Sequence, residues 1–363
     1  MDARDTEQPS RLIDVPLDGF ETFAGDGVSF VFAAAIPRNY TTLLSGHGGT
    51  GKSMTALTLA AHGACGREYA GLIPDGIQRS VYISLEDDAD IVLARLRKIT
   101  ARFNLDPNMV RENVRVLDGT GTDGVMMHRG SANGRLAETN LYHEMEAAAA
   151  NRDLIIIDNA SDALEALNYD NTSVRTFIRG LTQVARCNNS AVLLLAHVDK
   201  QTAKFGGAGN SYGGGTAWHN STRSRLALVA GRDGTVDLIH EKSNYGALMP
   251  TIRFRWHNGV MLPITAQDIA SGECEFDHAV LDAIRKATSE NETVTTATSG
   301  PRTTRNVLTP YLPNSMVTPV SLSASLKRLE AQGLIRKHQY QNSNRKQKEC
   351  WELAQAAPME ATE

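Results

Sequence analysis

Short apolar runs alternate with amphipathic segments over most of the chain. Five runs of five or six mostly apolar residues are bounded by polar residues and predict buried strands: 40–44, 80–84, 113–117, 154–158 and 191–196. Between them lie segments with helical spacing, at 52–64, 88–103, 138–151 and 172–188. Buried strands separated by helices are typical of a parallel sheet that is covered on both faces. The pattern therefore predicts an α/β fold with a mostly parallel sheet.

The pattern changes after residue 225. Three stretches rich in apolar, β-branched and aromatic residues, RLALVAG, TVDLIHEKS and TIRFRWHNGVMLP, are separated by GRDGT and NYGALMP. Short strands separated by such turns are typical of hairpins. We therefore expect residues 225–262 to extend the sheet with antiparallel strands.

A second, smaller pattern occupies the C-terminal part of the chain. Residues 321–332 place Leu322, Leu326 and Leu329 at helical spacing, and Gly333 suits the end of that helix. Two strands around the turn NSNRKQK then predict a hairpin. Helices followed by a β-hairpin resemble a winged helix, so we expect a small C-terminal winged-helix domain.

Five regions follow from these patterns. They are an N-terminal arm at 1–28, an α/β domain at 29–265, a linker at 266–278, a winged-helix-like domain at 279–355 and a tail at 356–363.

Composition excludes several classes of protein. The chain has 363 residues, of which 41% are hydrophobic and 21% charged, so it is not collagen-like, disulfide-rich or mostly disordered. It has no stretch near the roughly 18 apolar residues that cross a bilayer, and its acidic N-terminus lacks a secretory signal. Four cysteines are scattered without metal-ligand spacing: Cys65, Cys187, Cys274 and Cys350. We therefore expect a cytoplasmic protein with no membrane partner.

The net charge of −4 conceals an asymmetry. Residues 279–349 carry 11 Lys and Arg against 5 Asp and Glu, so this segment is +6 and the remainder of the chain is −10. A basic segment on an acidic body indicates that this segment meets a polyanion.

The strongest chemical signal is a glycine-rich loop between a predicted strand and a predicted helix. It consists of Gly46, His47, Gly48, Gly49, Thr50, Gly51, Lys52 and Ser53. Closely spaced glycines let backbone N–H groups surround phosphate oxygens, and the helix N-terminus adds positive potential. In this pattern Lys52 reaches the β- and γ-phosphates, and the Ser53 hydroxyl binds Mg²⁺. A chance glycine-rich turn is the alternative, but the strand–loop–helix context favours a P-loop that binds ATP.

Two carboxylates are candidates for the rest of the site. Asp158 ends a buried strand, where it is expected to hold Mg²⁺, although a solvent-exposed strand end is the alternative. Asn159 follows it, in place of the Glu that positions water in many ATP-driven motors. Glu86 ends the run VYISLE, the next apolar run after the P-loop helix, and strand ends line the ligand crevice of such sheets. We therefore predict Glu86 as the base that positions water, and either Asp87 or Asp88 as the cap of the following helix.

The arrangement resembles the RecA-like P-loop NTPase core and, within it, the RepA-type hexameric replicative helicases of plasmids and phages. The resemblance covers about 29–263. The segments that carry it are GHGGTGKS at 46–53, YISLED at 82–87, LIIIDNASDA at 154–163, LLLAHVDK at 193–200, GGTAWHNSTRSRL at 214–226 and EKSNYGA at 241–247.

The resemblance implies roles for further residues. His197 is expected to contact the γ-phosphate and report hydrolysis to the next loop, although Val198 stands where the family often shows a second histidine. A structural histidine at the end of a strand is the alternative. The glycine-rich loop 200–217 is expected to line a ring channel, where Lys200 and Lys204 contact single-stranded DNA and Phe205 or Tyr212 stacks on a base. A mobile linker is the alternative.

The resemblance also implies a site shared between subunits. Arg223, Arg225 and Lys242 are candidates for a cation that acts on the nucleotide of a neighbouring subunit, and Arg223 is preferred by the family pattern. Surface cations without such a role are the alternative.

The winged-helix-like domain adds a second set of basic candidates. They would contact DNA phosphates: Lys327, Arg328, Arg336, Lys337, Arg345, Lys346 and Lys348. Docking to a protein is the alternative use of such a module.

The P-loop predicts an ATPase with ATP and Mg²⁺ as cofactors, and the resemblance implies that it assembles as a homo-oligomeric ring, expected to be a hexamer, on single-stranded DNA. In plasmid or phage replication it would unwind DNA, with a replication initiator or primase as a further partner. A recombination or loading ATPase that binds DNA without unwinding is one alternative, and a nucleotide-switched transcription regulator is another.

Overall fold

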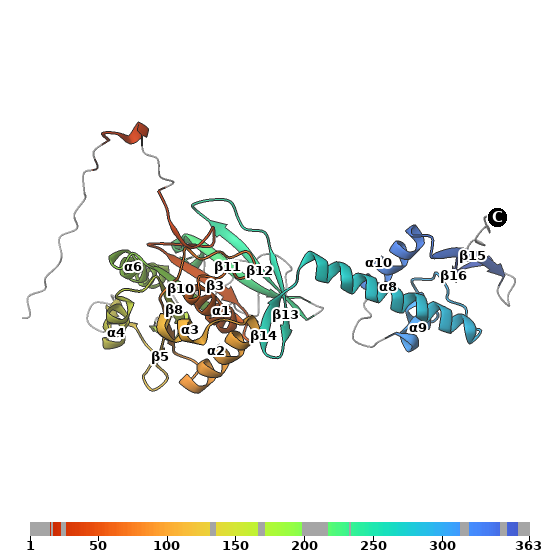
Figure 1. The fold of residues 1–363 in the computed structure, drawn as a ribbon, viewed down its shortest axis with the longest axis horizontal. Helices are drawn as coiled ribbons and strands as arrows, with labels where there is room; N and C mark the ends of the chain where they lie inside the picture. Colours follow the sequence, from red (N-terminus) through yellow and green to blue (C-terminus); the bar gives the residue numbers. More distant parts are fainter. Residues whose placement is uncertain are drawn as a thin grey trace, which may run out of the picture. The chain divides into compact units, whose positions relative to one another are not determined.

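The computed structural model describes residues 15, 17–22, 27–130, 136–165, 171–197, 217–231, 234–312, 319–341 and 347–354. The chain divides into two compact units, residues 1–263 and 264–363. Figure 1 shows the fold of both units.

A nine-stranded sheet forms the centre of the first unit, in the order β14-β13-β12-β11-β3-β10-β8-β4-β5. Its strands are β3 (Thr41–Gly46), β4 (Ser80–Ser84), β5 (Val114–Asp118), β8 (Leu154–Asp158), β10 (Ala191–His197), β11 (Ser224–Ala230), β12 (Thr235–Ser243), β13 (Ile252–His257) and β14 (Val260–Pro263). The neighbours in the row β11-β3-β10-β8-β4-β5 pair in parallel. Strands β12, β13 and β14 extend the sheet antiparallel. The predicted α/β class and the parallel strands are confirmed. The expected antiparallel extension is confirmed for β12, β13 and β14, but its predicted first strand, β11, pairs in parallel with β3 and belongs to the parallel part of the sheet.

The strands are apolar throughout because both faces of the sheet are buried. On β8, Leu154 and Ile156 point into one hydrophobic cluster, whereas Ile155 and Ile157 point into the other. Successive side chains of a strand alternate between faces, so a continuous apolar run requires cover on both.

Helices cover the two faces (Figure 1). The first cluster packs against α1 (Lys52–Ala64), α2 (Ala89–Phe103) and α3 (Pro107–Asn113), and the second against α4 (Asn140–Ala149), α5 (Ala160–Ala163), α6 (Asn171–Cys187) and α7 (Ala217–Ser221). The four predicted helices correspond to α1, α2, α4 and α6.

Several elements were not predicted because they are too short for a periodic pattern. They are η1 (Phe20–Thr22), β1 (Phe30–Phe32), β2 (Ile36–Pro37), β6 (Met127–Arg129), β7 (Leu136–Glu138), β9 (Leu164–Glu165), α3, α5 and α7.

The second unit consists of helices and a hairpin around its own core. Its elements are α8 (Ala266–Ser289), α9 (Thr304–Leu308), η4 (Thr309–Tyr311), α10 (Pro319–Ala331), β15 (Ile335–Gln341) and β16 (Gln347–Leu353). Val280, Ile284, Leu308, Leu326 and Trp351 are among the side chains that form the core.

The predicted linker 266–278 is helical, because these residues form the first half of α8. Thr265 starts the helix with a capping box, in which its side chain accepts from the Asp268 N–H and its own N–H donates to the Asp268 carboxylate. Phe276 and Asp277 are buried, so this half of the helix belongs to the domain.

Within the described residues, no helix is long and apolar enough to cross a membrane.

Candidate nucleotide-binding site

The glycine-rich loop lies at the carboxyl ends of the parallel strands, between β3 and α1. Gly49 and Gly51 have φ angles of 79° and 98°, which side chains disfavour. A Cβ atom on Gly51 would lie 2.3 Å from the Sδ of Met261 and 2.9 Å from the ring of Trp256. The loop therefore requires glycine at this position both for its conformation and for its close approach to β13 and β14.

Lys52 points its ammonium group back into this loop. Nζ donates to the carbonyl oxygens of Gly46 (3.0 Å) and His47 (3.1 Å) and lies 3.2 Å from Nδ1 of His197. Burial lowers the pKa of Lys52, and the negative charges of Asp158 and Glu86 oppose this shift. The structure thus holds a buried cation where the sequence predicted the phosphate-binding lysine.

Asp158 lies beside the start of α1, as the last residue of β8. Burial raises its pKa, while hydrogen bonds from the Ser53 and Tyr82 hydroxyl groups lower it. Tyr82 on the neighbouring strand β4 donates to Oδ2 of Asp158. The Ser53 and Asp158 oxygens, adjacent at a helix N-terminus, are a donor set that suits one Mg²⁺ ion shared with phosphate oxygens. Apart from the Ser53–Asp158 pair, we find no candidate metal site, because the described residues contain no cluster of three or more His, Cys, Asp or Glu suited to a metal.

Glu86 is two residues beyond the end of β4 and faces the same loop. Its Oε2 accepts a hydrogen bond from Nδ2 of Asn159 at 2.8 Å and lies 3.5 Å from Nε2 of His197. Because β4, β8 and β10 are neighbours in the sheet, residues from three strand ends meet here. Asn159, which stands where many ATP-driven motors have Glu, therefore supplies the donor that holds Glu86 in place.

These groups line a cavity of about 350 Å³. Its lining residues are Gly49, Gly51, Lys52, Ser53, Met54, Glu86, Asp87, Arg95, Lys98, Asp158, His197, Trp256 and Gly259. A glycine cradle, a buried ammonium and a Ser–Asp pair fit the polyphosphate of a nucleotide.

A comparison with protein-family models finds an AAA domain over residues 6–203. The chain belongs to this family of P-loop ATPases. The matched segment contains the P-loop, Glu86, Asp158 and His197. A search of curated proteins finds no match.

Several residues of the AAA domain site were not predicted. Arg95 and Lys98 come from α2, and Trp256, with 41% of its surface exposed, comes from the β13–β14 hairpin. Arg95 pairs with Asp87, and Asp88 caps α2 by accepting from the Ile91 N–H, which decides between the two predicted cap residues. The spacing of Arg95 and Lys98 on the exposed side of α2 was a visible signal, whereas Trp256 had none because its approach depends on sheet order.

The three candidate trans-acting cations lie away from this AAA domain site. Arg223 directly precedes β11, in which Ser224 pairs with Thr42 and Leu228 pairs with Gly46. Four residues of strand correspond to roughly 13 Å, so Arg223 and the P-loop are at opposite ends of the parallel strands. Arg223 therefore cannot reach the phosphate site of its own chain.

Arg225 and Lys242 are engaged within their own subunit. Arg225 is 5% exposed and its Nε lies 2.8 Å from Oε2 of Glu241. Nζ of Lys242 donates to the carbonyl oxygens of His219 (3.0 Å) and Thr222 (2.7 Å), at the end of α7. Of the three cations, Arg223 is the one whose side chain is exposed.

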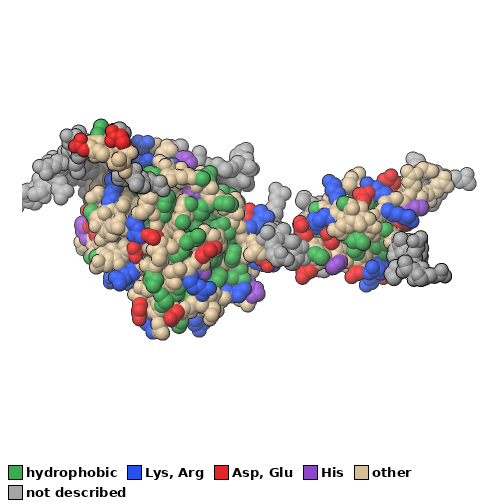
Figure 2. All heavy atoms as spheres, turned by 45° about the horizontal axis from the view of Figure 1, so that its top comes forward, with side chains coloured by type: hydrophobic (Ala, Val, Ile, Leu, Met, Phe, Trp, Pro, Cys, Tyr) green, Lys and Arg blue, Asp and Glu red, His purple; other side chains and the backbone are tan. Residues whose placement is uncertain are grey.

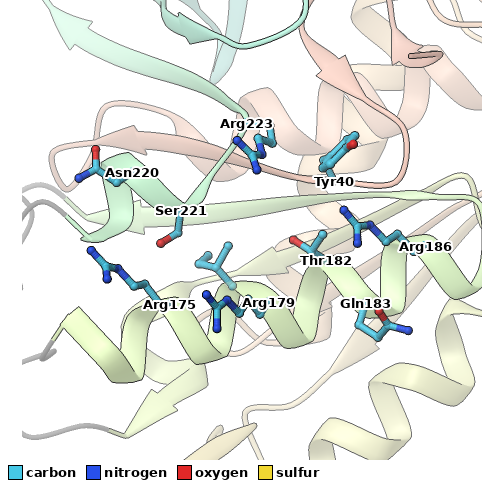
Figure 3. Close-up of a pocket in the computed structure, with 10 residues that line it drawn as sticks. Tyr40, Arg175, Arg179, Thr182, Gln183, Arg186, Asn220, Ser221 and Arg223 are labelled. Carbon is cyan, nitrogen blue, oxygen red and sulfur yellow. The ribbon is translucent and has the colours of Figure 1, made fainter. Parts of the chain in front are cut away.

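Arg223 lines a second cavity, of about 640 Å³, that shares no residue with the first (Figure 3). Tyr40 and three arginines of α6 line it as well: Arg175, Arg179 and Arg186. Hydrogen bonding with Tyr245 lowers the pKa of Tyr40, and the charges of Arg186 and Arg223 lower it further.

The basic residues predicted to bind DNA have different surroundings. Lys200, Lys204, Phe205, Tyr212, Arg345 and Lys346 lie outside the described residues. Arg328 forms a bidentate pair with Asp277, through bonds of 2.9 and 2.8 Å. Arg336 lies 3.7 Å from Glu352, and Lys337 lies 3.5 Å from Glu330 and over the ring of Trp351. Lys327 and Lys348 are exposed.

Proposed function

We propose that this chain is a ring-forming ATPase that couples hydrolysis of ATP, with Mg²⁺, to translocation on single-stranded DNA and to its unwinding in plasmid or phage replication. The observation that carries the proposal is the position of Arg223 at the opposite end of the strands from the P-loop. Such a geometry lets the Arg223 of one copy meet the phosphate site of the next. Repeated head to tail, this contact closes a ring, for which we propose six copies.

Within one subunit the residues have separate tasks. Ser53 and Asp158 would hold Mg²⁺, which when bound neutralises charge on the phosphates. Lys52 neutralises a further phosphate oxygen, and Glu86, held by Asn159, orients water and accepts its proton at Oε2. Arg223 of a neighbouring copy stabilises the charge that develops on the transferred group.

His197 connects the phosphate site to the rest of the chain. Its ring touches both Lys52 and Glu86, and it is the last residue of β10 before the segment that contains Lys200 and Lys204. A change in the phosphate group therefore alters the contacts of His197, which directly precedes the segment proposed to bind single-stranded DNA.

We propose a winged helix for the second unit. Its three helices α8, α9 and α10 are followed by a hairpin. Thr295, between α8 and α9, forms an isolated antiparallel β-bridge with Cys350 of β16. Because Arg328, Arg336 and Lys337 all pair with carboxylates, docking to a protein such as a replication initiator or primase is the favoured role. We expect the protein to act in the cytoplasm.

The first test separates a helicase from the alternative functions. ATP turnover is measured with and without single-stranded DNA, together with particle mass and displacement of a labelled strand. We expect stimulation by DNA, a ring mass and displacement. DNA binding without displacement favours the loading or recombination ATPase, and tight protection of one duplex site favours the transcription regulator.

The second test addresses the shared site by complementation. Arg223→Ala and Lys52→Ala subunits are each inactive alone, but a mixed ring contains some sites with an intact P-loop next to an intact arginine. An equal mixture should recover about one quarter of wild-type turnover if the ring assembles at random. Absence of recovery in rings shown by mass to be mixed contradicts a site shared through Arg223.

A further inference from the structure

The second cavity has a composition that its own subunit does not explain. We call its basic part the α6 groove, defined by Arg175, Arg179 and Arg186. The other lining residues are Tyr40, Ile178, Thr182, Gln183, Asn220, Ser221 and Arg223, so no Asp or Glu is present. Among the described residues, no carboxylate lies within 4 Å of the arginines of this groove, whereas the cations of the second unit are mostly paired.

The arginines form one stripe along α6. Arg175, Arg179, Thr182 and Arg186 are spaced by four, three and four residues, which places them on one side of a helix. The opposite side is buried in the core through residues such as Val174, Phe177 and Leu181. Like charges at this spacing repel each other, so an exposed stripe without acidic partners is the expected footprint of an anionic ligand.

The length of the stripe selects the kind of anion. Arg175 and Arg186 are eleven residues apart, which corresponds to roughly 16 Å along a helix. A single strand in a duplex carries a phosphate about every 3.4 Å, so this length matches several consecutive phosphates. One triphosphate is shorter than the stripe and would leave its ends unpaired.

The remaining lining suits a nucleic-acid backbone. Thr182, Gln183, Asn220 and Ser221 supply the neutral donors that commonly contact phosphate and sugar. At one end, the Arg186 guanidinium lies over the ring of Tyr40, 5.4 Å from its centroid. The ring of Tyr245 lies 4.9 Å from that of Tyr40, tilted by 36°. Aromatic rings beside a positive groove are typical of single-strand binding.

We infer that the α6 groove binds the sugar–phosphate backbone of single-stranded nucleic acid. The inference rests on the proposed function, which makes such a strand the track of the enzyme. It adds a binding surface on α6 and α7, outside the proposed channel loop. Because α7 follows the segment that starts at His197, one wall of the groove is connected along the chain to the phosphate site.

The test compares two triple variants of the full-length protein. Arg175→Gln/Arg179→Gln/Arg186→Gln removes the groove charges, and Arg97→Gln/Arg102→Gln/Arg111→Gln removes three exposed charges from α2 and α3. Fluorescence anisotropy measures binding of labelled oligothymidylate with Mg²⁺ and ATP across a range of salt concentrations. The groove variant should bind about tenfold or more weakly near 0.1 M salt, with a salt slope reduced by about 2. The control variant should bind within about twofold of wild type.

Further arms make the outcome decisive. Circular dichroism and thermal melting establish that both variants fold, and Arg→Lys at the three groove positions should restore most of the affinity because the charge returns. Equal weakening in both triple variants overturns the inference, since net charge alone would then explain it. DNA binding that is unchanged in the groove variant also overturns the inference. If DNA-free ATP turnover is then as low as that of Arg223→Ala, the groove serves the nucleotide of a neighbouring subunit. A wild-type protein that binds no oligonucleotide refutes the proposed function itself.

Discussion

The two units differ in how their clusters of basic residues are neutralised. In the first unit, Lys52 and the arginines of the α6 groove have no carboxylate within salt-bridge distance among the described residues, although other arginines of this unit, such as Arg95 and Arg225, are paired. In the second unit, which contains the basic segment 279–349, cations and carboxylates are interspersed on the visible surface (Figure 2), and Arg328, Arg336 and Lys337 pair with carboxylates. Positive charge along a sequence therefore indicates a binding surface only where the fold leaves it unneutralised.

Removal of a cation that binds a ligand should lower activity and leave stability unchanged, whereas removal of a charge that pairs within the fold should lower stability alone. The largest effect is expected at Lys52. Lys52→Ala should lower ATP turnover at least about 100-fold, because the ammonium neutralises charge that develops on the phosphates. Thermal stability should be maintained, because burial of this ammonium disfavours its charged form, as its lowered pKa shows. Phosphate release and thermal melting measure the two properties.

Arg102→Ala is the matched control for Lys52, since Arg102 is an exposed cation on α2 away from the cavity. It should leave both turnover and melting temperature unchanged. Near-normal turnover in Lys52→Ala would contradict the P-loop assignment.

An intermediate effect is expected at Glu86. Glu86→Gln keeps an oxygen that accepts from Asn159 but removes the base, so kcat should fall about 100-fold while nucleotide affinity is retained. Phosphate release and binding of a fluorescent nucleotide separate the two quantities, with Asp90→Asn on α2 as the control. If affinity falls as much as kcat, Glu86 organises the site instead of activating water.

The smallest effect, and one on stability alone, is expected at Asp277. Burial raises the pKa of this carboxyl, but the hydrogen bonds from Arg328 and its positive charge outweigh this effect, so the pKa lies below its usual value. Asp277→Asn should destabilise the second unit by about 1–3 kcal/mol at neutral pH, with ATP turnover unaffected.

The pH dependence follows from the sign of the shift. A lowered pKa means that the stabilisation is present above the unfolded value, near pH 4, and is lost as the pH falls through the folded value. Amide hydrogen exchange of α10 in the full-length protein should therefore accelerate more steeply on acidification in wild type than in Asp277→Asn. Glu352→Gln is the control, because its exposed pair with Arg336 should contribute at most about 0.5 kcal/mol. Equal acid sensitivity of all three proteins would show that the Arg328 pair does not stabilise the unit.

Local signals in the sequence were sufficient for much of the fold. Apolar runs located five of the six parallel strands, and the step from LLSG to a glycine-rich loop and a helical pattern located the P-loop. Local signals were insufficient where the same pattern fits more than one structure. The polar residues 266–278 resembled a linker, yet the capping box at Thr265 and the burial of Phe276 make them helical.

The amino-acid pattern is enough to identify most strands and helices and to locate the phosphate cradle, because hydrophobic period and glycine spacing act over a few neighbouring residues. Which distant groups meet depends on the folded arrangement of the strands. The order β10-β8-β4 brings His197, Asn159 and Glu86 together, and strand direction places Arg223 at the far end of the sheet. The tertiary structure likewise pairs Arg328 with Asp277, whereas it leaves the α6 arginines without an acidic neighbour among the described residues. These outcomes depend on contacts between residues far apart along the chain, and no local pattern carries that information.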